Sequence, residues 1–252
     1  MPSTLRRIIC ALSLLLMAAG CATTTGTLPE QPPMHTVSEV EADARLEVAP
    51  ERWERFNRSM YNFNYRLDRY LLLPIVRGYE FVTPGFAQKG VSNFFSNIEE
   101  VRNLTNSMFQ LKGMESLTTL GRFVTNSTIG IGGLFDVATP LGMPSRREDF
   151  GQTLGYWGVG PGPYLVMPFL GPSSLRDTSG FVADAAIRSA IIAGTGLDNS
   201  DNWDTIATVV VAMEAIDKRH LESFRYWGTG SPFEYDMVRY LYTKKREFDT
   251  AK

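Results

Sequence analysis

The sequence contains few of the residues that most often carry out catalysis or bind metals. Its 252 residues include only two cysteines and two histidines. Both cysteines, Cys10 and Cys21, lie near the N-terminus, so the rest of the chain has no thiol for a disulfide or a nucleophile. His35 and His220 offer little to a histidine-rich metal site or a Ser/His pair. These shortages argue against a zinc site, a cysteine or serine hydrolase and a disulfide-stabilised fold.

The chain also lacks an excess of charge of either sign. Its 25 basic and 27 acidic side chains give a formal net charge of −2, which leaves no electrostatic footprint for nucleic acid as a partner. The apolar run at residues 8–19 is too short to span a bilayer. The chain does have an apolar content of 44% and an aromatic content of 12%. That is enough for the core of one domain of roughly 200 residues.

The N-terminus has the pattern of a bacterial lipoprotein signal peptide, which we assign to residues 1–20. Arg6 and Arg7 precede the apolar run, and small residues precede Cys21. We expect Cys21 to become the acylated first residue of the mature chain. Ala22 after it is typical of lipoproteins that are sorted to the outer membrane. Ordinary signal-peptide cleavage, with Cys21 incidental, is the alternative.

The rest of the chain divides into a tether and a folded body. Residues 21–50 are rich in proline and acids, which predicts a flexible, lipid-anchored tether. Residues 51–252 show helical periodicity and no sustained alternation of period two, so we predict a mainly α fold without a substantial sheet. Glycine and proline are concentrated at residues 130–177, among apolar and aromatic residues. This pattern predicts an irregular but partly buried central segment with a functional role.

The clearest helix is predicted at residues 51–73, and Pro74 marks its expected end. One face is apolar and aromatic, and the other carries arginine and asparagine. A cationic helix with an aromatic face suits a membrane interface, while packing of that face into a protein core is the other interpretation. The apolar face consists of Trp53, Phe56, Met60, Phe63, Leu67 and Tyr70.

Further helices are predicted on both sides of the central segment. Two or three asparagine-rich helices precede it, and their asparagines are expected at turns or facing water, or alternatively lining a passage. After it, Ser174 is expected to cap a helix whose residues 181–193 are largely buried. The next helix covers residues 203–227. Ser231 and Glu234 have the spacing of a capping box at the start of the last one.

Three stretches resemble catalytic or binding motifs but lack the partners that those motifs need. Residues 149–151 match the metal-binding tripeptide of protein kinases, yet the other kinase motifs are missing. Ser174 and Asp177 have no histidine close in sequence, and His220 lies near a predicted helix end, where a solvated histidine is expected. We therefore predict no enzyme, no catalytic residue, no metal, and no cofactor other than the covalent lipid on Cys21.

Several short motifs follow one another in an order that resembles one protein family. They include WERFNR at residues 53–58, NFFSNI at 93–98, GGLFD at 132–136, EDFGQTLG at 148–155 and FLGPSSLRD at 169–177. Together they resemble the VacJ/MlaA-like outer-membrane phospholipid-transport lipoproteins. The resemblance runs from about residue 50 to residue 184 and agrees with the lipoprotein signal.

The resemblance implies a single ring-like helical domain, at residues 51–252, in the inner leaflet of the outer membrane around an amphipathic channel. Such a protein removes mislocalised phospholipids from the outer leaflet and passes them to a soluble periplasmic carrier, so that lipid asymmetry is maintained. The resemblance also implies a trimeric porin as partner. The alternatives are a structural lipoprotein that braces a porin and a periplasmic hydrolase of lipid or glycan.

The resemblance and the residue pattern together suggest two sets of site residues. The first lies on the first helix, at the rim of the channel, and the second forms a hairpin gate within the central segment. The rim set is Phe56, Met60, Asn62 and Phe63, and the gate set is Leu141, Gly142, Met143 and Phe150.

The first testable prediction concerns the lipid anchor. Mass spectrometry of the mature protein from outer membranes should find Cys21 as the N-terminal residue, with its thiol and amine acylated, because small residues precede it. Cys21→Ser should release the protein into the soluble fraction. An unmodified Cys21 in soluble wild-type protein would contradict the prediction.

Overall fold

The computed structural model describes residues 51–251 of this chain. The predictions for the signal peptide, for Cys21 and for the tether lie outside these residues. The elements follow in this order: α2 Glu54–Leu67, a π-helical turn Asp68–Leu72, α3 Leu73–Val82, α4 Gly85–Phe109, α5 Gly113–Thr128, α6 Phe150–Tyr156, β1 Tyr164–Met167, β2 Gly171–Ser174, α7 Leu175–Thr195, a 3₁₀ turn Leu197–Asn199, α8 Trp203–Leu221 and α9 Glu234–Thr250.

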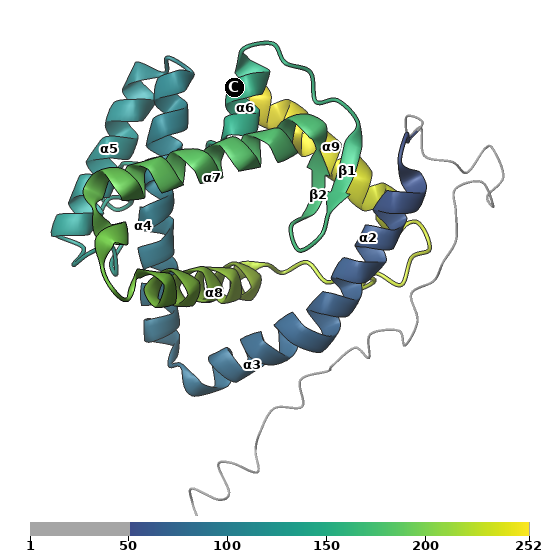
Figure 1. The fold of residues 1–252 in the computed structure, drawn as a ribbon, viewed down its shortest axis with the longest axis horizontal. Helices are drawn as coiled ribbons and strands as arrows, with labels where there is room; N and C mark the ends of the chain where they lie inside the picture. The colour runs from purple at the N-terminus through teal and green to yellow at the C-terminus, as the bar shows by residue number, and fades with distance from the viewer. Residues whose placement is uncertain (1–50, 252) are drawn as a thin grey trace, which may run out of the picture. The chain divides into compact units, whose positions relative to one another are not determined.

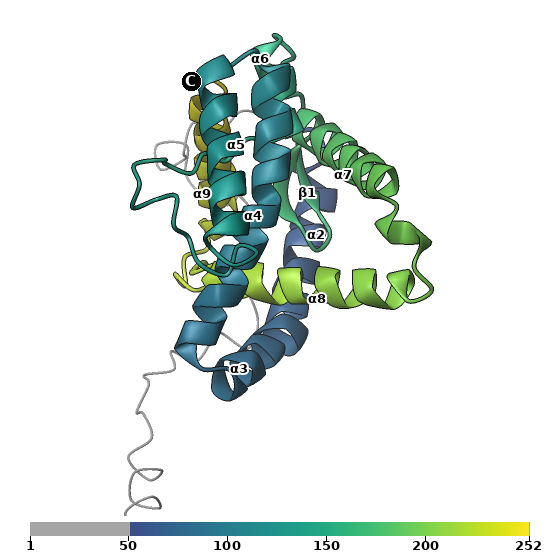
Figure 2. The ribbon, with the colours of Figure 1, turned by 90° about the vertical axis from the view of Figure 1, so that its left-hand side faces the viewer.

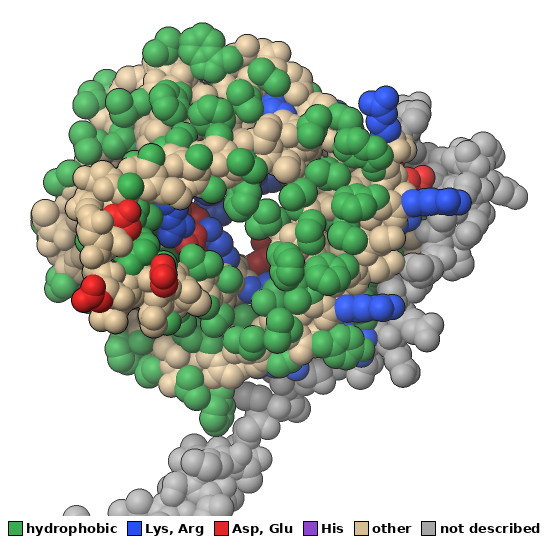
Figure 3. Space-filling view, viewed as in Figure 1, with side chains coloured by type: hydrophobic (Ala, Val, Ile, Leu, Met, Phe, Trp, Pro, Cys, Tyr) green, Lys and Arg blue, Asp and Glu red, His purple; other side chains and the backbone are tan. Residues whose placement is uncertain are grey.

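The described part is mainly α, as predicted. Its sheet is a single antiparallel hairpin in which β1 pairs with β2, and the sequence analysis did not foresee it. Helices α4 and α5 run side by side, whereas α7 and α8 cross the front of the view in Figure 1 and meet at one corner. The space-filling view shows an opening between these elements, with charged side chains at it and apolar side chains over the surrounding surface (Figure 3).

The first predicted helix does not end at Pro74. It continues through the π-helical turn into α3, where Pro74 occupies the first turn. Proline has no N–H and its ring clashes with the carbonyl four residues earlier, so it disrupts a regular helix interior. The wider turn directly before α3 accommodates this conflict without breaking the helix. The sequence rule identified the right position but the wrong outcome.

The apolar stripe of α2 does not pack into a protein core. Phe56 is 47% exposed and Phe63 is 40% exposed, while Asn57 and Asn64 are buried on the adjoining face. The interpretation in which the stripe forms the core is therefore wrong for most of its length. Met60 and Leu67 are half-buried, and Met60 packs against the aromatic cluster described next.

The main apolar cluster is small and joins α2, β1 and α9. Tyr61 lies at its centre, with its ring edge-on to Trp227 at 5.6 Å and to Tyr235 at 5.5 Å between centroids. Val166 from β1 completes the contact and is fully buried. The hydroxyl of Tyr61 donates to Glu234 at 2.9 Å, so the cluster also contains a buried carboxylate.

Two asparagines of α2 hold the β hairpin through its backbone. Asn57 donates to the carbonyl of Tyr164 at 3.1 Å and accepts from the N–H of Val166 at 2.8 Å. Asn64, two turns later, donates to the carbonyl of Met167 at 2.9 Å and accepts from the N–H of Phe169 at 2.9 Å. Each asparagine thus replaces a neighbouring strand, because it satisfies one carbonyl and one N–H that the two-stranded sheet leaves open.

The helix termini match the sequence predictions only in part. Ser174 caps α7 as expected, accepting from the N–H of Asp177 at 3.1 Å, and the next helix ends at Leu221 rather than near residue 227. The predicted capping box of α9 is wrong. Glu234 turns inward and accepts from Thr229 and the backbone of Trp227, so its carboxylate organises the preceding loop.

Helix α7 also differs from the prediction in its burial. Residues 181–193 were expected to be largely buried, but Arg176 and Gly180 are its buried residues. Phe181 is 53% exposed and Val182 is 63% exposed. Gly180 lies where a Cβ would overlap the backbone of Gly151, which permits the close contact between α6 and α7. Only the first part of α7 therefore packs against protein.

The second prediction tests the asparagine clamp. Asn64→Ala should lower the free energy of unfolding by roughly 1–3 kcal/mol, because it leaves two backbone groups of the hairpin without partners. Ser59→Ala, on the exposed side of the same helix, is the control and should change stability by less than about 0.5 kcal/mol. Denaturant unfolding in detergent, followed by tryptophan fluorescence, gives both values. Equal stability of the two variants would contradict the clamp.

Candidate functional site

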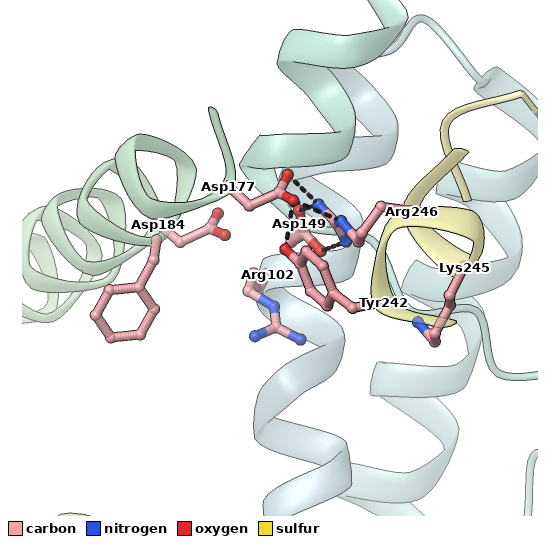
Figure 4. Close-up of a pocket in the computed structure, with 8 residues that line it drawn as sticks. Arg102, Asp149, Asp177, Asp184, Tyr242, Lys245 and Arg246 are labelled. Carbon is pink, nitrogen blue, oxygen red and sulfur yellow. Dashed lines mark hydrogen bonds and ion pairs between the residues drawn. The ribbon is translucent and has the colours of Figure 1, made fainter. Parts of the chain in front are cut away.

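A cavity of about 260 Å³ lies between α4, the start of α6, α7 and α9. Helices α4 and α7 also border the opening seen in Figure 3. Figure 4 shows charged side chains from four segments of the chain meeting at this cavity. Its polar lining consists of Arg102, Asp149, Asp177, Asp184, Tyr242, Lys245 and Arg246.

Arg246 is the centre of the charged group. Its guanidinium donates to both carboxylate oxygens of Asp149, at 2.7 and 2.9 Å, and to both of Asp177, at 2.6 and 3.0 Å. The hydroxyl of Tyr242 also donates to Asp177, at 2.6 Å. Because Asp149 caps α6, Asp177 lies in the first turn of α7 and Arg246 belongs to α9, this one side chain ties three helices together.

The pKa values of these carboxyl groups follow from their contacts. Burial by itself would raise the pKa of Asp149, but the hydrogen bonds and charge of Arg246 outweigh burial and hold that pKa well below its usual range. The same balance lowers the pKa of Asp177. Asp184 lacks such a cation in contact, and burial raises the pKa of its carboxyl above the ordinary value. Asp149 and Asp177 are therefore firmly ionised, while Asp184 is less strongly stabilised as an anion.

A second buried arginine holds the hairpin that the sequence predicted as a gate. Arg122 of α5 is 3% exposed and donates to Glu100 of α4 at 2.7 Å. It also donates to the hydroxyl of Thr139 at 3.0 Å and to the carbonyl of Met143 at 2.5 Å, and its guanidinium lies 3.5 Å from Asp136. The two sides of the hairpin, residues 136–149, are thus fixed to α4 and α5 by one side chain.

The tip of this hairpin is less tightly held than its base. Leu141 is 63% exposed, and Gly142 has a φ of +83°, a left-handed conformation that favours glycine. Met143 is half-buried, and its sulfur lies against α5 at Gly121. Leu141 is therefore the apolar residue of the predicted gate set that faces away from the protein.

Phe150 does not belong to the hairpin tip with which the sequence analysis grouped it. It is the first residue of α6, and its ring lies 6.0 Å from that of Phe109. Its backbone N–H donates to Asp184 at 3.0 Å, so its contact is with the charged cavity. The gate set therefore splits into a hairpin part and a residue beside the cavity.

The predicted rim residues share one helix but not one environment. Phe56 and Phe63 are exposed, Met60 packs against the tyrosine cluster, and Asn62 is half-buried. The ring of Phe63 makes an edge contact with Phe169, 5.5 Å between centroids, beyond the tip of β1. None of the four lines the charged cavity.

The sites predicted from the sequence include almost none of the cavity residues. Asp149 was part of a discarded kinase motif, Asp177 was an acid without a histidine partner, and Arg102, Asp184 and Arg246 had no predicted role. One signal was available: Asp177 and Asp184 are seven residues apart, about two helical turns, and so share a face of α7. Their partners on α4 and α9 come from distant parts of the sequence.

Two kinds of feature are absent from residues 51–251. No group of histidine, cysteine or acidic side chains there has the arrangement of a metal site. None of the helices in the same range has both the length and the apolar character needed to cross a membrane.

Comparison with known proteins identifies the family. A family model described as "MlaA lipoprotein" matches residues 50–249. The chain belongs to the MlaA lipoprotein family. The resemblance seen in the sequence motifs is thereby confirmed.

Relatives within the MlaA family include proteins with a stated role. The "Intermembrane phospholipid transport system lipoprotein MlaA" of Escherichia coli is 40% identical over 135 residues, which cover 52% of this chain and 54% of that protein. The protein of the same name in Haemophilus influenzae is 34% identical over 137 residues. An uncharacterised protein of Rickettsia felis is 42% identical over 125 residues, half of each chain. The chain thus matches about half the length of these relatives.

A solved structure matches the MlaA fold described here over a longer range. It is described as "Structural basis for maintenance of bacterial outer membrane lipid asymmetry" and has 31% sequence identity and a TM-score of 0.59. The match covers 80% of this chain and 99% of the other. The likeness in structure therefore covers more of this chain than the sequence matches to the relatives, which cover about half.

The third prediction concerns the Arg246 node and pH. Arg246→Gln should cost roughly 3–5 kcal/mol of stability at neutral pH, because it removes the one cation among residues 51–251 that Asp149 contacts and leaves Asp177 with only Arg176, at 3.2 Å. In the wild type the lowered pKa values of Asp149 and Asp177 contribute stability above the ordinary value of 3.8, and this contribution is lost as pH falls below it. In the variant, burial without Arg246 raises the pKa of Asp149 above its ordinary value, so stability should be recovered as pH falls from 7 towards 3.8, where the wild type is still unaffected.

The control for this prediction is Arg188→Gln, which removes an exposed ion pair between α7 and Glu214. Such a pair contributes about 0–1 kcal/mol, so the control should follow the wild-type pH curve. Denaturant unfolding from pH 7 down to pH 3 provides the comparison. Parallel curves for wild type and Arg246→Gln would show that the carboxylates are not held by this arginine.

Proposed function

We propose that this protein takes phospholipids that are misplaced in the outer leaflet of the outer membrane and passes them through its opening towards the periplasm. The observation that carries the proposal is the reversed polarity of the described part. Its buried side chains are largely polar and hydrogen-bonded, while large apolar side chains cover its outside and charged ones stand at the opening (Figure 3). Family membership and the phospholipid-transport role named for the relatives support it.

The outer surface fits a position in one leaflet of the membrane. At the corner between α3 and α4, Phe81 is 90% exposed, Val82 73% and Phe86 82%. Helices α7 and α8 are apolar yet mostly exposed, and Val211 of α8 is 59% exposed. Exposed apolar surface of this extent is costly in water but stable among acyl chains. We propose that these helices lie in the inner leaflet, which agrees with the absence of a spanning helix among residues 51–251.

The opening fits the two-sided chemistry of a phospholipid. A headgroup carries a phosphate and often an amine, so it needs charged or hydrogen-bonding side chains along its path, while acyl chains need apolar contact. Charged side chains lie at the opening and apolar side chains surround it. Helices α4 and α7, which border the opening, also supply charged side chains to the cavity. In this proposal the Arg122-anchored hairpin carries Leu141 as a small apolar barrier, and Phe56 and Phe63 lie at the rim facing the membrane.

The proposal includes the partners that the family resemblance implies. A soluble periplasmic carrier would receive the lipid and a trimeric porin would hold the protein in place, while Cys21 would carry the acyl anchor. The relatives' names speak of a transport system, which supports a relay between components. We further propose that the protein changes no covalent bond. A hydrolase would need a nucleophile beside a base. The hydroxyl oxygen of Ser174 instead caps α7 by accepting a hydrogen bond from the N–H of Asp177.

The fourth prediction tests passage and the gate together. Purified full-length protein is placed in vesicles that carry a fluorescent phospholipid in one leaflet, and extraction of the label by a soluble acceptor is followed. Wild-type protein should accelerate extraction over empty vesicles, whereas a lipoprotein that only braces a porin should not. Lyso-products would indicate a hydrolase instead, and intact lipid supports transport.

Leu141→Ser is the gate variant, and Leu117→Ser on α5 is its matched control, because the two leucines are 63% and 65% exposed. Both should unfold within about 0.5 kcal/mol of wild type, since neither is buried. The rate of lipid passage should change at least several-fold in Leu141→Ser only. If Leu141→Ser unfolds, or passes lipid as the control does, the tip does not control passage.

A further inference from the structure

The charged cavity in Figure 4 contains two groups of side chains with different amounts of remaining hydrogen-bonding capacity. The first group is closed. Arg246 donates hydrogen bonds to Asp149 and Asp177, and the hydroxyl of Tyr242 also donates to Asp177. These four side chains satisfy one another and link α6, α7 and α9. They therefore shape the cavity but have few unused hydrogen-bond donors or acceptors for a ligand.

The second group is open and comes from three helices: Arg102 of α4, Asp184 of α7 and Lys245 of α9. We call it the headgroup triad. The ion pair of Arg102 is a long 4.0 Å contact with Glu99, and its Nε is buried with no hydrogen-bond partner. Lys245 pairs with Asp249 at 2.7 Å, but its side chain is 72% exposed. A pair so open to solvent contributes about 0–1 kcal/mol and is readily exchanged for another anion.

Asp184 supplies the negative member of the triad. One of its oxygens accepts from Asn106 at 2.9 Å and the other accepts from the N–H of Phe150 at 3.0 Å. A carboxylate has about four acceptor positions, so about two remain for a further donor. These two contacts also hold the carboxylate in place, which suits recognition of a cation.

The arrangement matches a particular kind of ligand. Two cationic side chains beside one anchored carboxylate complement a phosphate linked to an amine, as in phosphoethanolamine. The cavity of about 260 Å³ is slightly below the range of roughly 300–1,000 Å³ that takes whole drug-sized ligands, so it suits a headgroup but not an entire lipid. Phe181, which also lines the cavity, offers apolar contact for the part of the lipid that follows the phosphate.

We propose that the headgroup triad binds the phosphate and the primary amine of a zwitterionic phospholipid headgroup, with Arg102 and Lys245 on the phosphate and Asp184 on the amine. The inference rests on the proposed function, since it takes the passing lipid as the ligand. Its consequence is selectivity: lipids with an aminoethyl headgroup are held at this point more strongly than lipids with a glycerol headgroup.

The fifth prediction follows from this assignment. Titration of full-length protein in detergent, followed by isothermal calorimetry, compares dihexanoyl phosphatidylethanolamine with dihexanoyl phosphatidylglycerol. The wild type should bind the ethanolamine lipid roughly tenfold more tightly, the size expected for one well-placed charge contact. Asp184→Asn should remove that preference and leave the affinity for the glycerol lipid nearly unchanged. Arg102→Gln should weaken both lipids by about the same factor.

Lys245 gives the sharpest control, because Lys244 is its neighbour on the same helix and also forms a surface ion pair, with Glu247 at 2.8 Å. Lys245→Gln should weaken both lipids several-fold, whereas Lys244→Gln, outside the cavity, should bind as the wild type does. Both substitutions remove the same charge from an exposed position, so neither depends on a buried contact. Equal binding by the two variants would overturn the assignment of Lys245.

Two further arms separate the sources of the phosphate and the two proposals from each other. Glycerophosphoethanolamine and inorganic phosphate should bind far more weakly than the lipid, and tight binding of either would mean a site for a soluble phosphate compound. If vesicles show lipid passage but no headgroup preference, the triad assignment fails and the transport proposal stands. If the Asp184-dependent preference appears without passage, the site stands and the transport proposal fails.

Discussion

The described part of this protein depends on polar groups that are buried and paired inside it. Asn57 and Asn64 satisfy the backbone of the β hairpin, Glu100 and Arg122 pair between α4 and α5, and Glu234 organises the loop before α9. A buried polar group without a partner costs about 1–3 kcal/mol, so the loss of any one of these contacts weakens the fold. The interior is held by directional bonds more than by apolar contact.

The outside is the complement of this interior. The apolar stripe of α2 and most of α7 and α8 are exposed. The hydrophobic effect normally buries such side chains inside the protein, so another apolar surface must cover them here. Acyl chains provide that surface in the proposed location. Hydrogen bonds have defined directions, so helices that are joined by them can keep an opening between them. Apolar packing would tend to close such an opening.

Two arginines connect different parts of this fold. Arg122 fixes both sides of the hairpin and leaves its tip exposed, whereas Arg246 joins α6, α7 and α9 and shapes the cavity. Each is a single side chain with several donors in a fixed plane, which lets it connect more than two elements at once. The Arg122-anchored hairpin and the cavity are therefore separate parts, and Phe150 belongs with the cavity because its N–H donates to Asp184.

The sequence by itself determined the helical class, the cap of α7 at Ser174 and, through ordered motifs, the family, because these depend on local spacing or on residue order. It also placed Pro74 at a disturbance of the helix but misjudged it as an end. Only the tertiary structure decided which face of α2 is buried and that the side chain of Glu234 turns inward. It also decided that Arg102, Asp184 and Lys245 line one cavity. Periodicity shows that a helix has two faces, but which face is buried depends on what surrounds it. The cavity is lined by residues as far apart in the sequence as Arg102 and Lys245, which are 143 positions apart, and no local rule predicts that two such residues share a cavity.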